Sequence, residues 1–269
     1  MATRIRVFGP LTVETRHLVV VGRDVPGRKP RQLLQLLVLY SGRLVSKERL
    51  ADLLWGDDLP AEPSATLEHY VAVLRRGLHG RAHGADSFVR TEVAGYRLDL
   101  DQVAVDFVEF MAAVRDPSTW RRADALDSAL RLSAADLFEE EQGAVWAAQA
   151  RAEVRRLRTD LLVRAAELAV TDGDPVAAAG HAAAALAAEP HLESAHRALM
   201  CAHYVHGDQQ RALDAYRACR NLLLADLGVE PVRQTRDLHA AVLRHESPTV
   251  LVNRLWPGGH SASSRRPAW

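Results

Sequence analysis

The sequence predicts an α+β winged helix over residues 1–104, followed by an all-α, TPR-like helical domain over residues 105–246. Three observations predict this fold class: alternating apolar residues at the start, three helical patterns followed by a hairpin pattern, and two matching turns further on. A chain of 269 residues, 48% of them hydrophobic, exceeds the usual size of one domain and can fill two cores. Residues 247–269 mix Gly, Ser, Pro and Arg without periodicity, which predicts a disordered tail.

The first 25 residues predict short antiparallel strands. Ile5 and Val7 alternate with polar or small residues, as do Leu11 and Val13, and glycines punctuate the segment. The pattern then changes to helices. Residues 30–40 form an apolar helix, and Ser46 is a suitable N-cap for a second helix.

A third helix begins near Ser64 and carries a buried stripe. Its apolar positions follow the spacing of one helix face: Leu67, Val71, Leu74 and Leu78. After a polar loop, residues 88–91 and 96–100 flank Gly95 as a β-hairpin. Strands, three helices and then a hairpin are the order of a winged helix.

From Val105 onward the pattern is helical. The expected helices span residues 106–115, 119–133, 143–171, 175–188, 192–206, 209–226 and 231–245. Gly173-Asp174 and Gly207-Asp208 lie 34 residues apart at helix–helix turns, and this spacing is the TPR period. Ala178 and Ala212, at matching repeat positions, are small enough to let paired helices approach closely.

Several motifs in this order resemble the SARP family, the Streptomyces antibiotic regulatory proteins. They are RKPRQLLQLLVLYSGRLVSKERLADLLWGDDLP, TLEHYVAVLRRGL, FVRTEVAGYRLDL, VDFVEF, HLESAHRALMCAHYVHGDQQRALDAYRACRNLLLADLGVEP and RDLHAAVL, and the resemblance covers about residues 3–246. The first hundred residues resemble an OmpR-type winged helix, the output domain of two-component (phosphorelay) systems. The remainder resembles the bacterial transcriptional activation domain.

The resemblance implies a pathway-specific transcriptional activator of a secondary-metabolite (antibiotic) gene cluster. Its implied partners are double-stranded DNA with tandem promoter repeats, RNA polymerase holoenzyme and a second copy of the chain on DNA. The resemblance also implies a recognition helix around residues 64–78. Four of its positions would point into the major groove: Thr66, His69, Tyr70 and Val73. There Thr66 and His69 would hydrogen-bond base edges, and Val73 would contact a thymine methyl group.

Basic and polar residues around that helix are expected to contact phosphates. Those before and within the first two helices are Arg28, Lys29, Arg31, Arg43 and Ser46, and those at the end of the recognition helix are Arg75 and Arg76. In the wing, Arg90, Thr91 and Arg97 flank the turn and are expected to contact DNA, whereas Tyr96 is expected to pack inside. The alternative for Arg75 and Arg76 is that they solvate the helix end and favour its dipole.

Three positions depart from the family pattern. A polar or basic residue is usual at Val73, glutamine at Glu68, and arginine at Glu92 in the wing. If Glu92 faces the duplex, like-charge repulsion weakens DNA binding. The alternative is that Glu92 turns away and pairs with Arg90 or Arg97, which holds the hairpin in register.

The charge total alone does not establish nucleic-acid binding. Residues 1–104 hold 15 Arg and Lys against 12 Asp and Glu, and the remainder holds 19 against 22. A helical scaffold that binds a partner protein and carries a weakened or vestigial winged helix therefore remains the alternative function. A contiguous positive surface around the third helix would favour DNA binding. Ligand sensing by the helical domain is a third alternative, for which the sequence shows no site.

The sequence predicts no enzyme activity, cofactor or metal, because it has no GxxxxGK, GxSxG or HExxH motif. Cys201 and His203 lie on different helix faces, so a core cysteine with surface histidines, His206 included, is preferred over a metal site. Glu139–Glu141 are expected to be a solvated run of carboxylates. Two cysteines, no long apolar run and no signal-peptide pattern predict a cytoplasmic protein without membrane contact.

Overall fold

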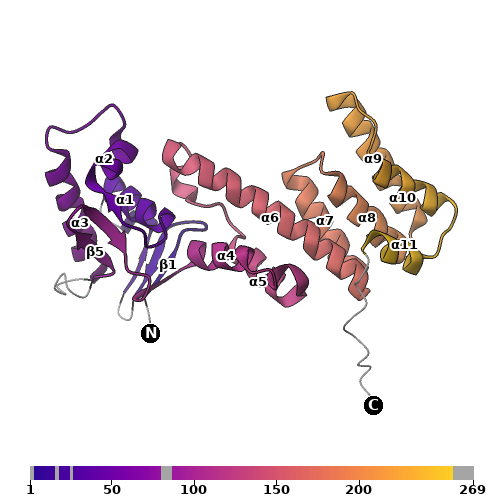
Figure 1. The fold of residues 1–269 in the computed structure, drawn as a ribbon, viewed down its shortest axis with the longest axis horizontal. Helices are drawn as coiled ribbons and strands as arrows, with labels where there is room; N and C mark the ends of the chain where they lie inside the picture. Colours follow the sequence, from indigo (N-terminus) through magenta and orange to yellow (C-terminus); the bar gives the residue numbers. More distant parts are fainter. Residues whose placement is uncertain (1–2, 16–17, 25–26, 80–86, 257–269) are drawn as a thin grey trace, which may run out of the picture. The chain divides into compact units, whose positions relative to one another are not determined.

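The computed structural model describes residues 3–15, 18–24, 27–79 and 87–256 (Figure 1). The chain forms two compact units. The first unit combines residues 1–115 with residues 131–154, and the second combines residues 116–130 with residues from 155 onward. The predicted fold class is confirmed, because a small α+β unit built around three helices precedes the helical part.

The first unit begins with a four-stranded sheet in the order β3-β2-β1-β7. Its strands are β1 (Thr3–Arg6), β2 (Thr12–Glu14), β3 (Val19–Val21) and β7 (Val103–Val105). The first three run antiparallel, as predicted, while β7 pairs with β1 in parallel. The register places Val20, Val13, Ile5 and Val105 in one row across the sheet, and all four are buried. This row is the inward face that the period-two alternation predicts.

Three helices and a second sheet complete the winged helix. The helices are α1 (Arg28–Leu39), α2 (Lys47–Trp55) and α3 (Pro63–His79), and the strands are β4 (Val45–Ser46), β5 (Val89–Glu92) and β6 (Gly95–Leu98). Central α1 packs against α2, α3 and β6, so its middle turns are buried on most sides. Ser46 caps α2, as predicted, because its hydroxyl oxygen accepts a hydrogen bond from the Arg49 N–H at 3.1 Å.

Glycine is required where the wing meets β4. A Cβ atom added to Gly95 would lie 1.9 Å from the Val45 carbonyl oxygen, so any side chain would push β6 away from β4. The pairing continues past the strand end, because the Lys47 N–H donates to the Ala94 carbonyl at 3.1 Å. These contacts fix the wing against the start of α2.

The first unit extends beyond the expected boundary at residue 104. Asp106 begins α4 (Asp106–Arg115), and its buried carboxylate accepts hydrogen bonds from the backbone N–H groups of Val7, Phe8 and Phe107 at 2.7–3.2 Å. Burial raises the pKa of this carboxyl group. Further on, the Phe138 N–H donates to the Val7 carbonyl at 2.8 Å. Residues well beyond the winged helix therefore complete its first sheet.

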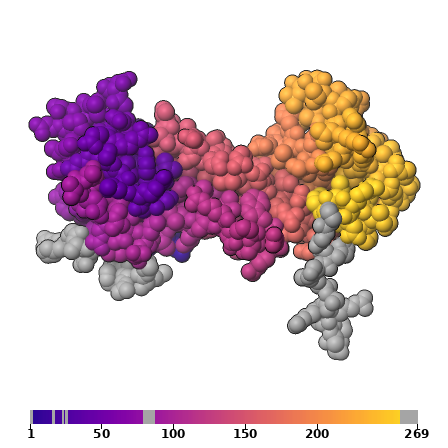
Figure 2. Space-filling model, viewed as in Figure 1, coloured from indigo at the N-terminus to yellow at the C-terminus, as the bar shows by residue number. Residues whose placement is uncertain are grey.

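The second unit is helical. It contains most of α5 (Ala123–Leu132), the later turns of α6 (Val145–Asp172), and then α7 (Pro175–Ala188), α8 (Glu193–Val205), α9 (Gln209–Leu227) and α10 (Arg233–Leu243). Helices α7, α8 and α9 pack in succession as antiparallel neighbours, and α10 packs on α8 and α9. In Figure 2 the yellow C-terminal residues lie against the orange residues of these helices.

The 34-residue repeat has a clear structural cause. Gly173 and Gly207 adopt φ values of 80° and 88°, a left-handed conformation that ends a helix and favours glycine. Asp174 and Asp208 then cap α7 and α9 by accepting hydrogen bonds at 2.9 and 3.0 Å from the backbone N–H groups of Ala177 and Arg211. Ala178 and Ala212 are fully buried. The predicted TPR-like arrangement is confirmed.

The expectation of disorder from residue 247 is wrong for its first part. Residues Pro248–Leu255 form α11, and Leu251 and Val252 are buried against α8 and its neighbours. Burial of these apolar side chains offsets the conformational entropy that the segment loses on ordering. Composition alone does not reveal this packing. Residues 257–269 of the expected tail lie outside the described residues. No helix in the described ranges is both long and apolar enough to cross a membrane.

Candidate nucleic-acid interface

Helix α3 presents two different faces. The predicted stripe of Leu67, Val71, Leu74 and Leu78 is buried, which confirms the predicted inner side. On the outer face, His69 and Arg76 are exposed, while Thr66, Tyr70 and Val73 are half-buried. These are the side chains of α3 that remain accessible to a partner molecule.

Local contacts position these side chains. The Thr66 hydroxyl donates to the Glu62 carbonyl at 2.9 Å and can still accept a hydrogen bond through its oxygen. The Tyr70 ring lies between two others, with ring centroids 6.0 Å from Trp55 of α2 and 6.2 Å from His69. These aromatic contacts fix Tyr70 and leave His69 on the open side of the helix.

Lys47, which the sequence interpretation did not include, lies beside α3. Its Nζ lies 2.7 Å from a carboxylate oxygen of Glu68 on α3, and this hydrogen bond raises the pKa of the lysine. The signal was its position, directly after the N-cap Ser46 at the start of α2. Glu68, one of the departures from the family pattern, therefore pairs with a cation beside α3.

Arg75 ties α3 to the wing. Its guanidinium donates to the Val89 carbonyl and the Thr91 hydroxyl, at 2.7 and 2.8 Å for Nη2. Partial burial lowers the pKa of Arg75. This side chain, expected to contact phosphate, has its acceptors within the chain, whereas the guanidinium of Arg76 is exposed and contacts only the Ala72 carbonyl of its own helix, at 3.3 Å, in the described structure.

The two arginines of the wing are both neutralised. Arg90 and Arg97 lie directly opposite each other on β5 and β6. Two like charges at such positions destabilise a strand pair unless they are neutralised. Arg90 pairs with Asp99 at 2.9 Å, and this hydrogen bond holds the pKa of Asp99 below its usual value. Arg97 pairs with Glu92 at 3.0 Å. The structure therefore shows the second of the two arrangements expected for Glu92. Tyr96 is buried, as predicted.

The expected phosphate contacts at the start of α1 have partners within the chain. Lys29 donates to the Leu54 carbonyl, and its partial burial lowers its pKa. Arg31 donates to the Gly22 carbonyl at 3.3 Å. Arg28 pairs at 3.2 Å with Glu141, although its own side chain is 67% exposed. Nearer to α2, Arg43 is exposed and lies 5.5 Å from the centre of the Tyr40 ring.

The expectation of a solvated Glu139–Glu141 run is wrong at its last position. Glu141 is 1% exposed, and its Oε2 accepts hydrogen bonds from Gln32 at 2.7 Å and from Arg28. Arg151 of α6 donates to the backbone carbonyl of Glu141 at 2.8 Å. A carboxylate that is buried in this way needs such donors. No local pattern around Glu141 indicates these donors, because Arg28 is 113 positions away.

Cys201, His203 and His206, close together in the sequence, differ in burial. Cys201 is buried and burial raises its pKa to about 12, while His206 is exposed. Within the described residues, no group of three or more His, Cys, Asp or Glu side chains is placed to hold a metal ion.

The first unit has a buried three-helix core, a third helix with one accessible face, and a hairpin held by side-chain contacts. These features define a winged-helix transcription regulator. Residues 26–98 match the family described as "Transcriptional regulatory protein, C terminal", and residues 99–243 match "Bacterial transcriptional activator domain". The chain belongs to this activator-domain family and, with both domains in this order, to the SARP regulators.

Several curated proteins are similar over nearly the whole chain. Regulatory protein DnrI of Streptomyces peucetius is 28% identical, with 90% of this chain and 92% of the relative covered. Transcriptional regulator RedD of Streptomyces coelicolor is 30% identical, with 94% and 73% covered. Transcriptional regulatory protein MoaR1 of Mycobacterium tuberculosis is 28% identical, with 96% and 84% covered.

A solved structure shares the fold. Mycobacterium tuberculosis EmbR, in complex with a low-affinity phosphopeptide, superposes with a TM-score of 0.77 at 21% identity. The similarity covers 94% of this chain and 69% of that chain, so it includes both compact units.

Proposed function

We propose that this protein binds promoter DNA through α3 and the wing, and activates transcription of a secondary-metabolite gene cluster. The observation that carries the proposal is the outer face of α3, where His69 is exposed between half-buried Thr66 and Val73. These side chains offer hydrogen bonds to base edges and an apolar contact for a thymine methyl group. Membership of the SARP regulators supports the same function.

The phosphate contacts in this proposal are assigned by exposure. Arg43 and Arg76 are exposed and have only backbone or ring contacts within the described structure, so they are the best placed to meet phosphates. Arg28, Lys29 and Arg31 would have to exchange internal partners for phosphate oxygens. We further propose that two copies occupy tandem repeats, and that the helical unit contacts RNA polymerase holoenzyme.

Fluorescence anisotropy with labelled promoter fragments from the flanks of the gene tests this proposal. His69→Ala should weaken binding to its preferred fragment by roughly tenfold, since one base contact contributes about 1–3 kcal/mol of discrimination. His206→Ala, an exposed histidine in the second unit, is the matched control and should bind normally. Equal binding by both variants would show that α3 does not recognise the base sequence.

A scaffold function has one specific observation in its favour. Three cations around α3 and the wing are neutralised by carboxylates, in the pairs Lys47–Glu68, Arg90–Asp99 and Arg97–Glu92. A winged helix that no longer binds DNA would show this pattern, because nothing would select against acidic residues beside its cations. This function predicts only weak binding that does not depend on sequence, and stable capture of a partner protein by the helical unit.

A further inference from the structure

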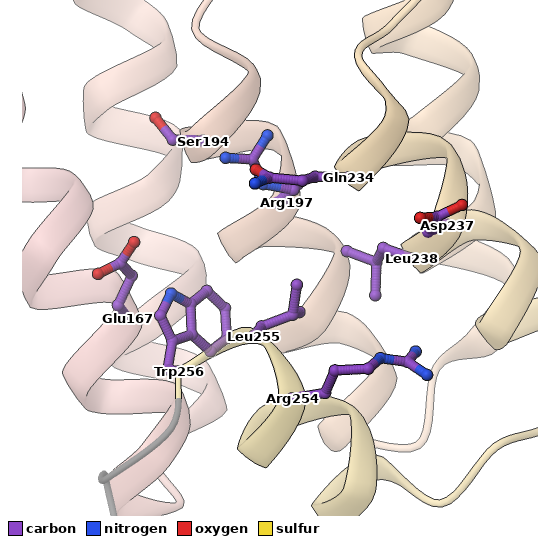
Figure 3. A pocket seen from close by; sticks show the side chains of 9 residues that line it. All are labelled: Glu167, Ser194, Arg197, Gln234, Asp237, Leu238, Arg254, Leu255 and Trp256. Carbon is purple, nitrogen blue, oxygen red and sulfur yellow. The ribbon is translucent and has the colours of Figure 1, made fainter.

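A cavity of about 410 Å³ lies in the second unit between α6, α8, α10 and α11 (Figure 3). Its volume falls within the range of small-molecule pockets, roughly 300–1,000 Å³. The last helix, α11, forms one wall, and its buried Leu251 and Val252 hold that wall in place. The cavity belongs to the helical unit and uses none of the residues assigned to DNA.

The two ends of the cavity differ in chemistry. Ser194, Arg197 and Gln234 gather at one end, and Leu255 and Trp256 lie toward the other (Figure 3). Leu238, a buried residue of α10, adds to the apolar lining. A ligand that fills this space therefore meets hydrogen-bond donors at one end and an aromatic ring at the other.

The uncompensated charge of the lining is positive. Three of its four charged side chains are already paired: Glu167 with Arg164 at 3.0 Å, Asp237 with Arg233 at 3.3 Å, and Arg254 with Glu246 at 3.0 Å. Arg197 takes part in none of the ion pairs found in the described ranges. Its Nη1 donates to the Thr235 hydroxyl at 3.1 Å, and Thr235 is fully buried.

This arrangement pre-orients Arg197. The bond to a buried hydroxyl restricts the guanidinium, while the side chain stays half-buried in the wall of the cavity. A guanidinium has five N–H donors in a fixed plane, so one bond to Thr235 leaves donors for a carboxylate, sulfonate or phosphate oxygen. Half-burial strengthens such a charge-assisted bond relative to one at the open surface.

We propose that this cavity binds a small organic anion with an apolar body. Arg197 pairs with the anionic group, Ser194 and Gln234 complete its hydrogen bonds, and Leu238, Leu255 and Trp256 contact the body. Because the ligand would touch four helices, including α11, its binding would stabilise the second unit by an amount that rises with the logarithm of the ligand concentration above its Kd.

The probe 8-anilino-1-naphthalenesulfonate tests the proposal on the full chain, because it joins a sulfonate to an aromatic body and fluoresces when bound. Saturable binding is expected, and Arg197→Gln should weaken it by about tenfold or more, since a hydrogen bond to a charged group contributes about 1.5–3 kcal/mol. Arg197→Lys keeps the charge and should retain part of the affinity. Arg211→Gln, a 71% exposed arginine of α9 outside the cavity, should bind as the natural protein does.

The uncharged analogue N-phenyl-1-naphthylamine separates the anionic contact from simple apolar binding. It should bind at least tenfold more weakly than the sulfonate. Circular dichroism and a thermal melt confirm that Arg197→Gln is folded. The proposal is overturned by the absence of saturable binding, by equal affinity for the two probes, or by an equal loss in Arg197→Gln and Arg211→Gln.

Discussion

Replacing Glu141 by alanine should loosen the attachment of residues 137–144 to α1. The carboxylate accepts one hydrogen bond from Gln32 at 2.7 Å and a longer pair from Arg28 at 3.2 and 3.4 Å. The bond from Gln32 to a buried charge contributes about 1.5–3 kcal/mol, and the pair with Arg28 contributes less than about 1 kcal/mol because that guanidinium is mostly exposed. These values already include the desolvation of the bonded groups, so the expected net loss is about 2 kcal/mol.

Hydrogen exchange measured by mass spectrometry resolves this local effect. Peptides covering residues 137–144 should exchange roughly thirtyfold faster in Glu141→Ala, which is the factor that corresponds to about 2 kcal/mol. Glu140→Ala is the matched control, because this neighbouring glutamate is exposed and its exchange should be unchanged. Unaltered exchange in Glu141→Ala, or the same acceleration in both variants, would refute the role assigned to the buried carboxylate.

Three further predictions concern the winged helix. Glu92→Gln should lower the stability of the first unit by about 0.5–1 kcal/mol, because it breaks the pair with Arg97, and Asp101→Asn, just after the same hairpin, should not; an unchanged melt for Glu92→Gln would contradict the contribution assigned to this pair. Asp99→Asn should lower the free energy of unfolding of the first unit by about 1 kcal/mol at pH 7. Because Arg90 lowers the pKa of Asp99, its contribution is present above the unfolded pKa and lost as pH falls through the lowered folded pKa, so the two proteins should converge in acid; a difference that persists there would contradict it. Arg43→Ala should reduce the slope of log K against log salt by about 1 without altering sequence preference, and a changed preference would mean that Arg43 reads bases.

Local features of the fold could be predicted from the sequence. The buried stripe of α3, the cap at Ser46 and the glycine–aspartate turns each depend on residues within a few positions of one another. Their periodicity and capping chemistry are therefore visible in the chain itself. The same holds for Tyr96, whose place in a hairpin strand fixed the face on which it packs.

Contacts between distant segments could not be predicted in this way. Asp106 accepts hydrogen bonds from Val7 and Phe8, about a hundred positions earlier, and Glu141 is buried only because α1 brings it Gln32 and Arg28. A carboxylate in a run of three looks solvated until its partners are placed. The internal partners of Lys29 and Arg75 are hidden for the same reason, so counting basic residues overstates the charge available to DNA.

Affinity selection of sheared genomic DNA from the source organism, using the full chain, tests sequence-specific promoter binding through α3 most directly. The natural protein should enrich a small set of promoter fragments that contain tandem repeats, and His69→Ala should lose that enrichment while His206→Ala keeps it. Enrichment no greater than that of an unrelated protein, or an unchanged fragment set with His69→Ala, would contradict the proposed function.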